Sequence, residues 1–303
     1  MPEGYVHVRT ARAAAIGADI PIFNRQAFYA GANGPDLFFF YRAWTKKRDP
    51  DLPALGVRMH REQCGEFLLS LVTHAETPAQ KGYVLGFLCH YALDALAHPY
   101  IAFLTAEGMP YHIPNGHGRY EIALDSALHK KDTGRRAIKA RENTGLLKGQ
   151  ALAEVVALLR VSIAEIYGLS LSALTLSDCF HQAVLLRRFF YSPLHIKKAA
   201  AGIAELIAFH KRGFITCHMT PARLKKHLPK AWTDPFSGEE KDGGAEAILT
   251  EAESRCAALM RSARKYWEGR LAPSTLSRNV GNLSYETGLS WKKAPKYKTA
   301  VPS

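Results

Sequence analysis

Three side chains that can bind a metal are evenly spaced along one apolar stretch of the sequence. His90, Asp94 and His98 follow one another at four-residue intervals, and their neighbours are almost all apolar. In a helix with about 100° of rotation per residue, this spacing places the three on one face. Imidazole and carboxylate groups so arranged suit a divalent cation such as zinc. The alternative is a pair of hydrogen-bonded core histidines with Asp94 as their partner, but burying three polar groups is costly without compensation.

A second pair of the same kind, His117 and Glu121, also stands at a four-residue spacing. That spacing suits a metal but is common by chance. His7, Asp36 and His60 stand where helices are expected to begin or bend. Taken singly, each of these three would be a capping or surface residue.

The order of these residues along the chain is more specific than any one of them. A His near the N-terminus is followed by a loop Asp, a His that opens a helix, a His-x3-Asp with a further His, and a His-x3-Glu. This series resembles the ligand order of the zinc-dependent phospholipase C family over about the first 130 residues. The resemblance implies an all-α, multi-helix bundle of the zinc-dependent phospholipase C and zinc nuclease type, with zinc ions in a cleft.

The resemblance also assigns each residue, by its position, to a zinc ion. The first ion takes Asp36, His60, His90 and Asp94, the second takes His98, His117 and Glu121, and a third would take His7 and share Asp94. The chain would thus carry two or three zinc ions. Two cations that share a water lower its pKa from 15.7 toward about 7 and so supply hydroxide at neutral pH. Asp36 would be the catalytic general base beside that water.

Three departures from the family pattern bear on the third ion and on the substrate. Secreted members begin with a Trp that completes the third site, whereas the first Trp here is Trp44. Leu37 and Val57 stand where the choline-lipid enzyme has aromatic residues, and Asp94 and His98 are closer together than in the secreted enzyme. The pattern therefore favours phospholipid cleavage over specificity for phosphatidylcholine.

The expected substrate is a phospholipid, cleaved by a metal-activated hydroxide to diacylglycerol and a phosphorylated headgroup. An alternative is a zinc nuclease acting on single-stranded nucleic acid, since those enzymes resemble the phospholipases in fold and ligand order. They close the series with His-x3-Asp, so His117-x3-Glu121 makes nucleic acid the less favoured partner. A further alternative is a non-catalytic, metal-stabilised binding module, which would not need an open metal cluster in order to fold.

The composition is that of a folded protein with a basic C-terminal half. The chain has 303 residues, of which 47% are hydrophobic, and five cysteines without a CxxC pair, which indicates reduced thiols. With no signal peptide or membrane span evident, the expected location is the cytoplasm. Of the net charge of +13, +9 falls from Tyr191 onward. This half could contact an anionic membrane surface or be simply a solvated basic face. The oligomeric state is left open.

Apolar residues recur with a helical period and no run alternates as a strand would, so the fold class is all-α. Helices are expected at Arg9–Gly17, Arg25–Ala32, His60–His74, Ala79–Thr105, Gly118–Lys131, Lys148–Gly168, Leu171–Tyr191, His195–Lys211, Pro221–His227 and Gly244–Arg270. Pro50–Gly56 is expected to be a loop, and Pro99 to end or kink its helix. Residues 1–270 are predicted to form a single metallohydrolase domain, and residues 271–303 a basic, partly extended tail.

Overall fold

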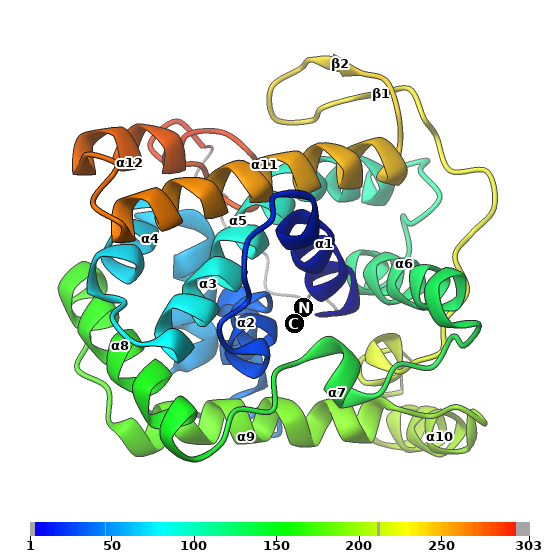
Figure 1. Cartoon of the computed structure of the whole chain (residues 1–303). Coiled ribbons are helices and arrows are strands. Elements are labelled where there is room, and N and C mark those ends of the chain that lie inside the picture. Colours follow the sequence, from blue (N-terminus) through cyan, green and yellow to red (C-terminus); the bar gives the residue numbers. More distant parts are fainter. Residues whose placement is uncertain (1–3, 46, 211–212, 295–303) are drawn as a thin grey trace.

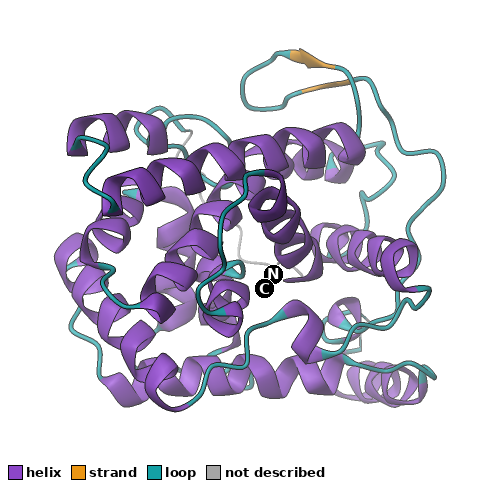
Figure 2. Ribbon diagram, in the orientation of Figure 1, coloured by secondary structure: helices purple, strands orange, loops and turns teal. Residues whose placement is uncertain are grey.

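The computed structural model describes residues 4–45, 47–210 and 213–294, and the regular secondary structure within them is almost entirely helical (Figure 1; Figure 2). The elements are α1 (Gly4–Gly17), α2 (Arg25–Gly31), the 3-10 helix η1 (Gly34–Phe40), α3 (Leu52–Arg61), α4 (Cys64–His74), α5 (Pro78–Thr105), α6 (Gly116–Thr133), α7 (Ala140–Asn143), α8 (Gly149–Tyr167), α9 (Ala173–Phe190), α10 (Ile196–Phe209), the 3-10 helix η2 (Thr216–His218), β1 (Trp232–Thr233), β2 (Glu240–Lys241), α11 (Ala245–Trp267) and α12 (Pro273–Val280). The all-α prediction is confirmed. The strands β1 and β2 form a small antiparallel hairpin that projects beside α11.

Helix α5 runs through the middle of the molecule and carries the central part of the site (Figure 1). It begins with a capping box, because the Thr77 hydroxyl accepts from the Gln80 N–H while the Gln80 side chain accepts from the Thr77 N–H. Its apolar sequence is buried on most sides, since α1, α2, α6 and α11 pack around it. Helix α2 comes very close, because a Cβ on Gly86 would lie 2.1 Å from the carbonyl oxygen of Phe28.

Of the two outcomes expected at Pro99, an end of the helix is ruled out, and α5 agrees with the helix predicted over Ala79–Thr105. It continues to Thr105, although proline has no N–H to donate to the carbonyl of Ala95. That carbonyl faces Gly288, where a Cβ would lie only 2.5 Å from the Ala95 oxygen. The C-terminal segment therefore packs directly on this turn of the helix.

The loop predicted at Pro50–Gly56 is wrong, because α3 already begins at Leu52. The Asp51 side chain caps the helix by accepting from the Ala54 N–H at 3.2 Å. Pro53 stands in the first turn, where its missing N–H would have no helical partner in any case. As a result, the helix predicted over His60–His74 is the end of α3 followed by α4.

The helix predicted at Pro221–His227 is also wrong, since this segment has no helical assignment. The Tyr111 hydroxyl accepts from the backbone N–H of Lys225 at 3.1 Å, and the Tyr100 hydroxyl donates to the carbonyl of Pro229 at 2.7 Å. These contacts hold the backbone through its neighbours in the fold. The short elements η1, α7, α12 and the hairpin were not predicted.

Part of the segment expected to be a tail is folded onto the helices. Helix α12 packs against α4 and α11, and the loop that follows it carries the buried Tyr285. The N–H of Tyr285 donates to the carbonyl of His60 at 2.8 Å. Residues 295–303 lie outside the described residues, and the division of the chain at residue 270 stays a prediction. In the part of the chain that the structure describes, no helix combines the length and apolarity needed to cross a membrane.

Candidate metal centre

The structure brings together all eight residues that the sequence singled out. They come from five elements: His7 from α1, Asp36 from η1, His60 from α3, His90, Asp94 and His98 from α5, and His117 and Glu121 from α6. Seven of these side chains are buried, whereas the side chain of His117 is 46% exposed. The assembly therefore meets solvent at the start of α6.

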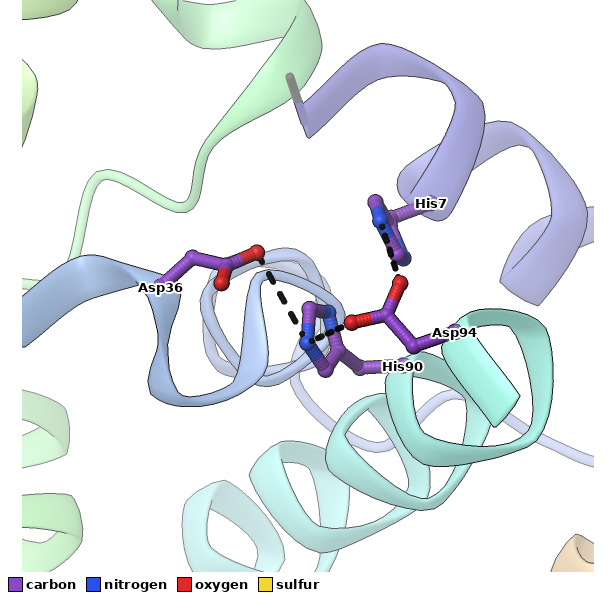
Figure 3. Close-up of side chains that lie close together, drawn as sticks. All are labelled: His7, Asp36, His90 and Asp94. Atoms are coloured by element: carbon purple, nitrogen blue, oxygen red, sulfur yellow. Dashed lines mark ion pairs between the residues drawn. The ribbon is translucent and has the colours of Figure 1, made fainter. Parts of the chain in front are cut away.

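The larger set, here called the Asp94 group, consists of His7, Asp36, His60, His90 and Asp94. Ligand atoms of all its members except His60 lie within 4.8 Å of one another (Figure 3). The Oδ1 atom of Asp94 lies 3.3 Å from His7 Nε2, and its Oδ2 atom lies 2.9 Å from His90 Nε2. His60 adjoins them, with Nε2 3.0 Å from Asp36 Oδ1. Asp94 thus directs its two oxygens toward different histidines.

The smaller set, here called the Glu121 group, consists of His98, His117 and Glu121. The Oε1 atom of Glu121 lies 2.9 Å from His117 Nε2 and 3.7 Å from His98 Nε2. A cavity of about 40 Å³ borders both groups, lined by His7, Asp94 and Glu121 together with apolar side chains of α5, α6 and α11. That space is sufficient for water next to both carboxylates.

Three of the buried histidines are held by backbone carbonyls. The Nδ1 atoms lie 2.7 Å from the oxygen of Gly56 for His60, 3.3 Å from that of Ala32 for His90, and 2.9 Å from that of Tyr285 for His98. Because a carbonyl can only accept, Nδ1 must carry the proton in each ring. In the neutral ring Nε2 then presents a lone pair, and it faces a carboxylate in all three cases. Such an arrangement is repulsive unless a cation or a second proton lies between the two groups.

Several buried polar atoms of the two groups have no regular hydrogen bond, although Asp36 Oδ1 faces His60 Nε2 at 3.0 Å and His90 Nε2 faces Asp94 Oδ2 at 2.9 Å. They are His7 Nδ1, Asp36 Oδ1, His90 Nε2, Asp94 Oδ2 and Glu121 Oε2. A buried polar atom without a partner costs about 1–3 kcal/mol, so a cluster of them in a folded protein indicates that something else binds there. Nitrogen and carboxylate oxygen are a donor set that fits zinc.

The pKa values show what takes the place of a cation when none is bound. Burial opposes protonation of His98, but the carboxylates of Asp94 and Glu121 outweigh it and raise the pKa of His98 to about 10. Burial likewise opposes protonation of His90, and Asp94 with Asp36 still raises its pKa. Burial and the neighbouring His90 lower the pKa of His7 to about 4. A proton on His98 therefore balances the carboxylates in the metal-free protein, and the raised pKa of His90 acts in the same direction.

The same charges act on the carboxylates in the opposite direction. Burial alone would favour the neutral acid, but His90, His98 and His7 hold the pKa of Asp94 well below its usual range. The pKa of Glu121 is also lowered, because His117 and His98 outweigh the effect of burial. Both acids are thus ionised and available to a cation at neutral pH.

Residues that position the ligands were largely missed by sequence reasoning. Asp125 is buried and accepts from the N–H groups of Tyr5 and Val6 at 2.9 and 2.7 Å. It thus fixes the first turn of α1, which carries His7. Gly34 has φ of 50°, and a Cβ there would lie 2.2 Å from the ring of His90.

The signals for these residues differ in kind. The Gly-Pro-Asp sequence marks a break before Asp36, so Gly34 was open to prediction from local chemistry. The carbonyl of Tyr285 meets His98 across 187 positions of the chain, and no local pattern announces that contact.

The family model that describes zinc-dependent phospholipase C matches residues 6–163, which is more than half of the chain and includes all eight residues of the two groups. The chain belongs to this family. No curated protein and no solved structure matches it. The resemblance found in the ligand order is thus confirmed. Membership of the zinc-dependent phospholipase C family and the buried His and Asp cluster together support a zinc-dependent phosphodiesterase.

Proposed function

We propose that this member of the zinc-dependent phospholipase C family hydrolyses phospholipids and releases diacylglycerol and a phosphorylated headgroup. The observation that carries the proposal is the orientation of His60, His90 and His98, whose Nε2 atoms all face carboxylates while backbone carbonyls hold Nδ1. Zinc-binding histidines commonly have their second nitrogen held in this way, because the contact fixes both the tautomer and the ring.

The two groups differ in how many ions they would hold. The Glu121 group offers three protein ligands, which leaves a fourth position of a tetrahedral zinc open for water or substrate. The Asp94 group offers five, more than one tetrahedral ion needs. Because the oxygens of Asp94 face His7 on one side and His90 on the other, this carboxylate is suited to bridge two ions. The proposal is therefore two ions sharing Asp94 and one in the Glu121 group.

The reaction is displacement at phosphorus. Bound zinc would supply hydroxide from water at neutral pH and neutralise the charge of the phosphate oxygens. The Asp36 carboxylate is placed to accept the proton of the attacking water, since it is buried beside His60 and His90. A new bond forms from the water oxygen to phosphorus, the bond from phosphorus to the glycerol oxygen breaks, and that oxygen takes up a proton. His117, at the open side, marks where the phosphate would arrive.

Metal content and substrate choice test this proposal together. Elemental analysis of the purified protein should give about three zinc ions per chain, and removal of zinc with a chelator should abolish phospholipid turnover until zinc is restored. Protein without zinc, or with activity that is indifferent to it, would contradict the proposed centre. Efficient degradation of single-stranded DNA without turnover of any phospholipid would replace the phospholipase by the nuclease and leave the ligands as they are.

A further inference from the structure

Helix α10 exposes its apolar face to solvent and turns charged side chains toward the protein interior, the reverse of an ordinary surface helix. In a helix with about 100° per residue, Ile196, Ile203 and Ile207 fall within about 40° of one another. All three are exposed, with Ile203 at 56% and Ile207 at 74%. The opposite face carries Lys198 and Glu205, and Glu205 is completely buried. The isoleucines thus point to solvent while charged side chains point inward.

The inward charges are fully engaged, so this orientation is a stable part of the fold. The Glu205 carboxylate accepts from the N–H of Gly213 at 2.9 Å and from the N–H and hydroxyl of Thr216 at 3.0 and 2.9 Å. The Lys198 ammonium donates to the carbonyls of Met219 and Pro221 at 2.7 and 3.1 Å. Turning the isoleucines inward would break these charge-assisted hydrogen bonds. The apolar face of α10 therefore stays outward.

This face is connected to the open side of the metal centre. The loop that Glu205 holds is hydrogen-bonded to the start of α6, because the Asn115 side chain donates to the carbonyl of Gly213 at 2.7 Å. His117, the exposed ligand, stands two residues after Asn115. Phe214 in the same loop is also exposed. Figure 1 shows α10 at the edge of the molecule, beyond the end of α9, on the side where α6 lies.

The charge around α10 decides which partner fits. Residues 187–230 contain ten Lys or Arg and a single acid, the buried Glu205. A second copy of the chain on this face would bring two basic surfaces together, which like charges oppose. An anionic bilayer satisfies both features, since its headgroups attract the basic side chains and its acyl boundary accepts the apolar face.

We propose that the outward face of α10, formed by Ile196, Ile203 and Ile207, docks the protein on an anionic phospholipid bilayer with the His117 side of the site toward the membrane. The inference rests on the phospholipid substrate proposed above, but docking is measured without turnover. A helix that lies in the interface with its apolar side inward and Lys or Arg beside it is a common mode of peripheral binding.

Matched double variants test the proposal. Ile203→Gln with Ile207→Gln changes the α10 face, and Ile16→Gln with Leu174→Gln changes two residues of similar exposure, 76% and 72%, on α1 and at the far end of α9. Zinc-loaded full-length proteins are sedimented with vesicles of phosphonate analogues of phosphatidylcholine that contain roughly one-third of the phosphatidylglycerol analogue, in which a P–C bond replaces the P–O bond to glycerol and no turnover can occur. We expect the α10 variant to bind at least about tenfold more weakly than wild type and the control variant to bind as wild type does. Turnover of a short soluble phosphodiester should be the same in all three.

A second measurement reports insertion directly. The native cysteines are all buried, so a fluorophore sensitive to polarity can be placed selectively at Ile207→Cys or, as control, at Ile16→Cys. Only the α10 label should shift to the blue on adding anionic vesicles. Equal vesicle binding by wild type and the α10 variant would overturn the proposal, as would a wild-type dimer that the α10 variant converts to a monomer. Vesicle binding through α10 without turnover of any phospholipid would support docking and contradict the proposed function.

Discussion

The Asp94 group and the Glu121 group use the same ligand types in different surroundings. The Asp94 group is buried and contains two carboxylates among three histidines, whereas the Glu121 group has one carboxylate and reaches solvent through His117. Burial restricts exchange of ions and water, while an exposed ligand leaves room for a substrate oxygen. A single helix, α5, thus contributes ligands both to a buried metal site and to a site that is open to substrate.

The largest effect should follow Asp94→Asn, because it removes charge from the proposed bridge. Outer-sphere partners of metal ligands are commonly worth 10–100-fold, so loss of a direct shared ligand should lower turnover by more than about 100-fold. Zinc content should fall with it, and His7→Ala should cost less than Asp94→Asn. The matched control is Asp178→Asn, on α9 outside both groups. Equal zinc content and activity in Asp94→Asn and wild type would contradict the role of Asp94.

The next effect should come from His117→Ala, which removes one ligand from the Glu121 group and none from the Asp94 group. We expect it to lower the zinc content by about one ion per chain and turnover by about 10–100-fold. The two ions of the Asp94 group should remain, because the side chains of that group are buried and untouched. Elemental analysis beside kinetics with a soluble diester checks both numbers. If His117→Ala empties the Asp94 group as well, the two groups are not separable.

A smaller and graded effect is expected from pH. His98, whose pKa is raised to about 10 in the metal-free protein, must lose its proton before zinc can bind Nε2. Zinc affinity of the Glu121 group should therefore rise about tenfold per pH unit between about pH 7 and 9. The stability of the metal-free protein should depend on pH in the opposite direction. The raised pKa of His98 contributes stability that is fully present below the pKa of about 6.5 in the unfolded chain and is lost as pH rises through about 10. Calorimetry in buffers of different ionisation enthalpy counts the released protons, and a pH-independent affinity would contradict the assignment.

The smallest effect should follow Asp125→Asn, because Asp125 is not a proposed ligand and acts on the Asp94 group through α1. The carboxylate of Asp125 accepts from two N–H groups at the start of α1, and the amide can offer only one oxygen to them. We expect the free energy of unfolding of the metal-free protein to fall by about 1–3 kcal/mol. Urea denaturation in the presence of a chelator measures this, with Asp178→Asn again as control. An unchanged unfolding free energy would mean that α1 is held without this cap.

Prediction from sequence succeeded where the chemistry is local in the chain and failed where it is not. The four-residue spacing of His90, Asp94 and His98 fixes a helix face, and α5 carries all three as expected, with His90 and Asp94 in the Asp94 group and His98 in the Glu121 group. The capping box and the helical period of α5 are likewise local signals.

The failures have separate physical reasons. The segment after Pro221 was misassigned because hydroxyl contacts from α5 and the loop before α6 hold its backbone. The packing of Tyr285 in the segment 271–294 was not foreseen, because nothing near it in the sequence indicates that its carbonyl meets His98. The loop predicted before Gly56 was an avoidable error, since Asp51 followed by a proline in the first turn is a known helix start.

The carbonyls that hold His60, His90 and His98 have a consequence for the kinetics of metal uptake. Freezing a side chain costs up to about 1–2 kcal/mol of entropy, and here that ordering is completed when the chain folds rather than when the ion arrives. The rings already have their final orientation before an ion arrives. An incoming ion therefore has to displace protons but does not have to reorient its ligands. Uptake should accordingly be limited by deprotonation of the ligands rather than by their movement.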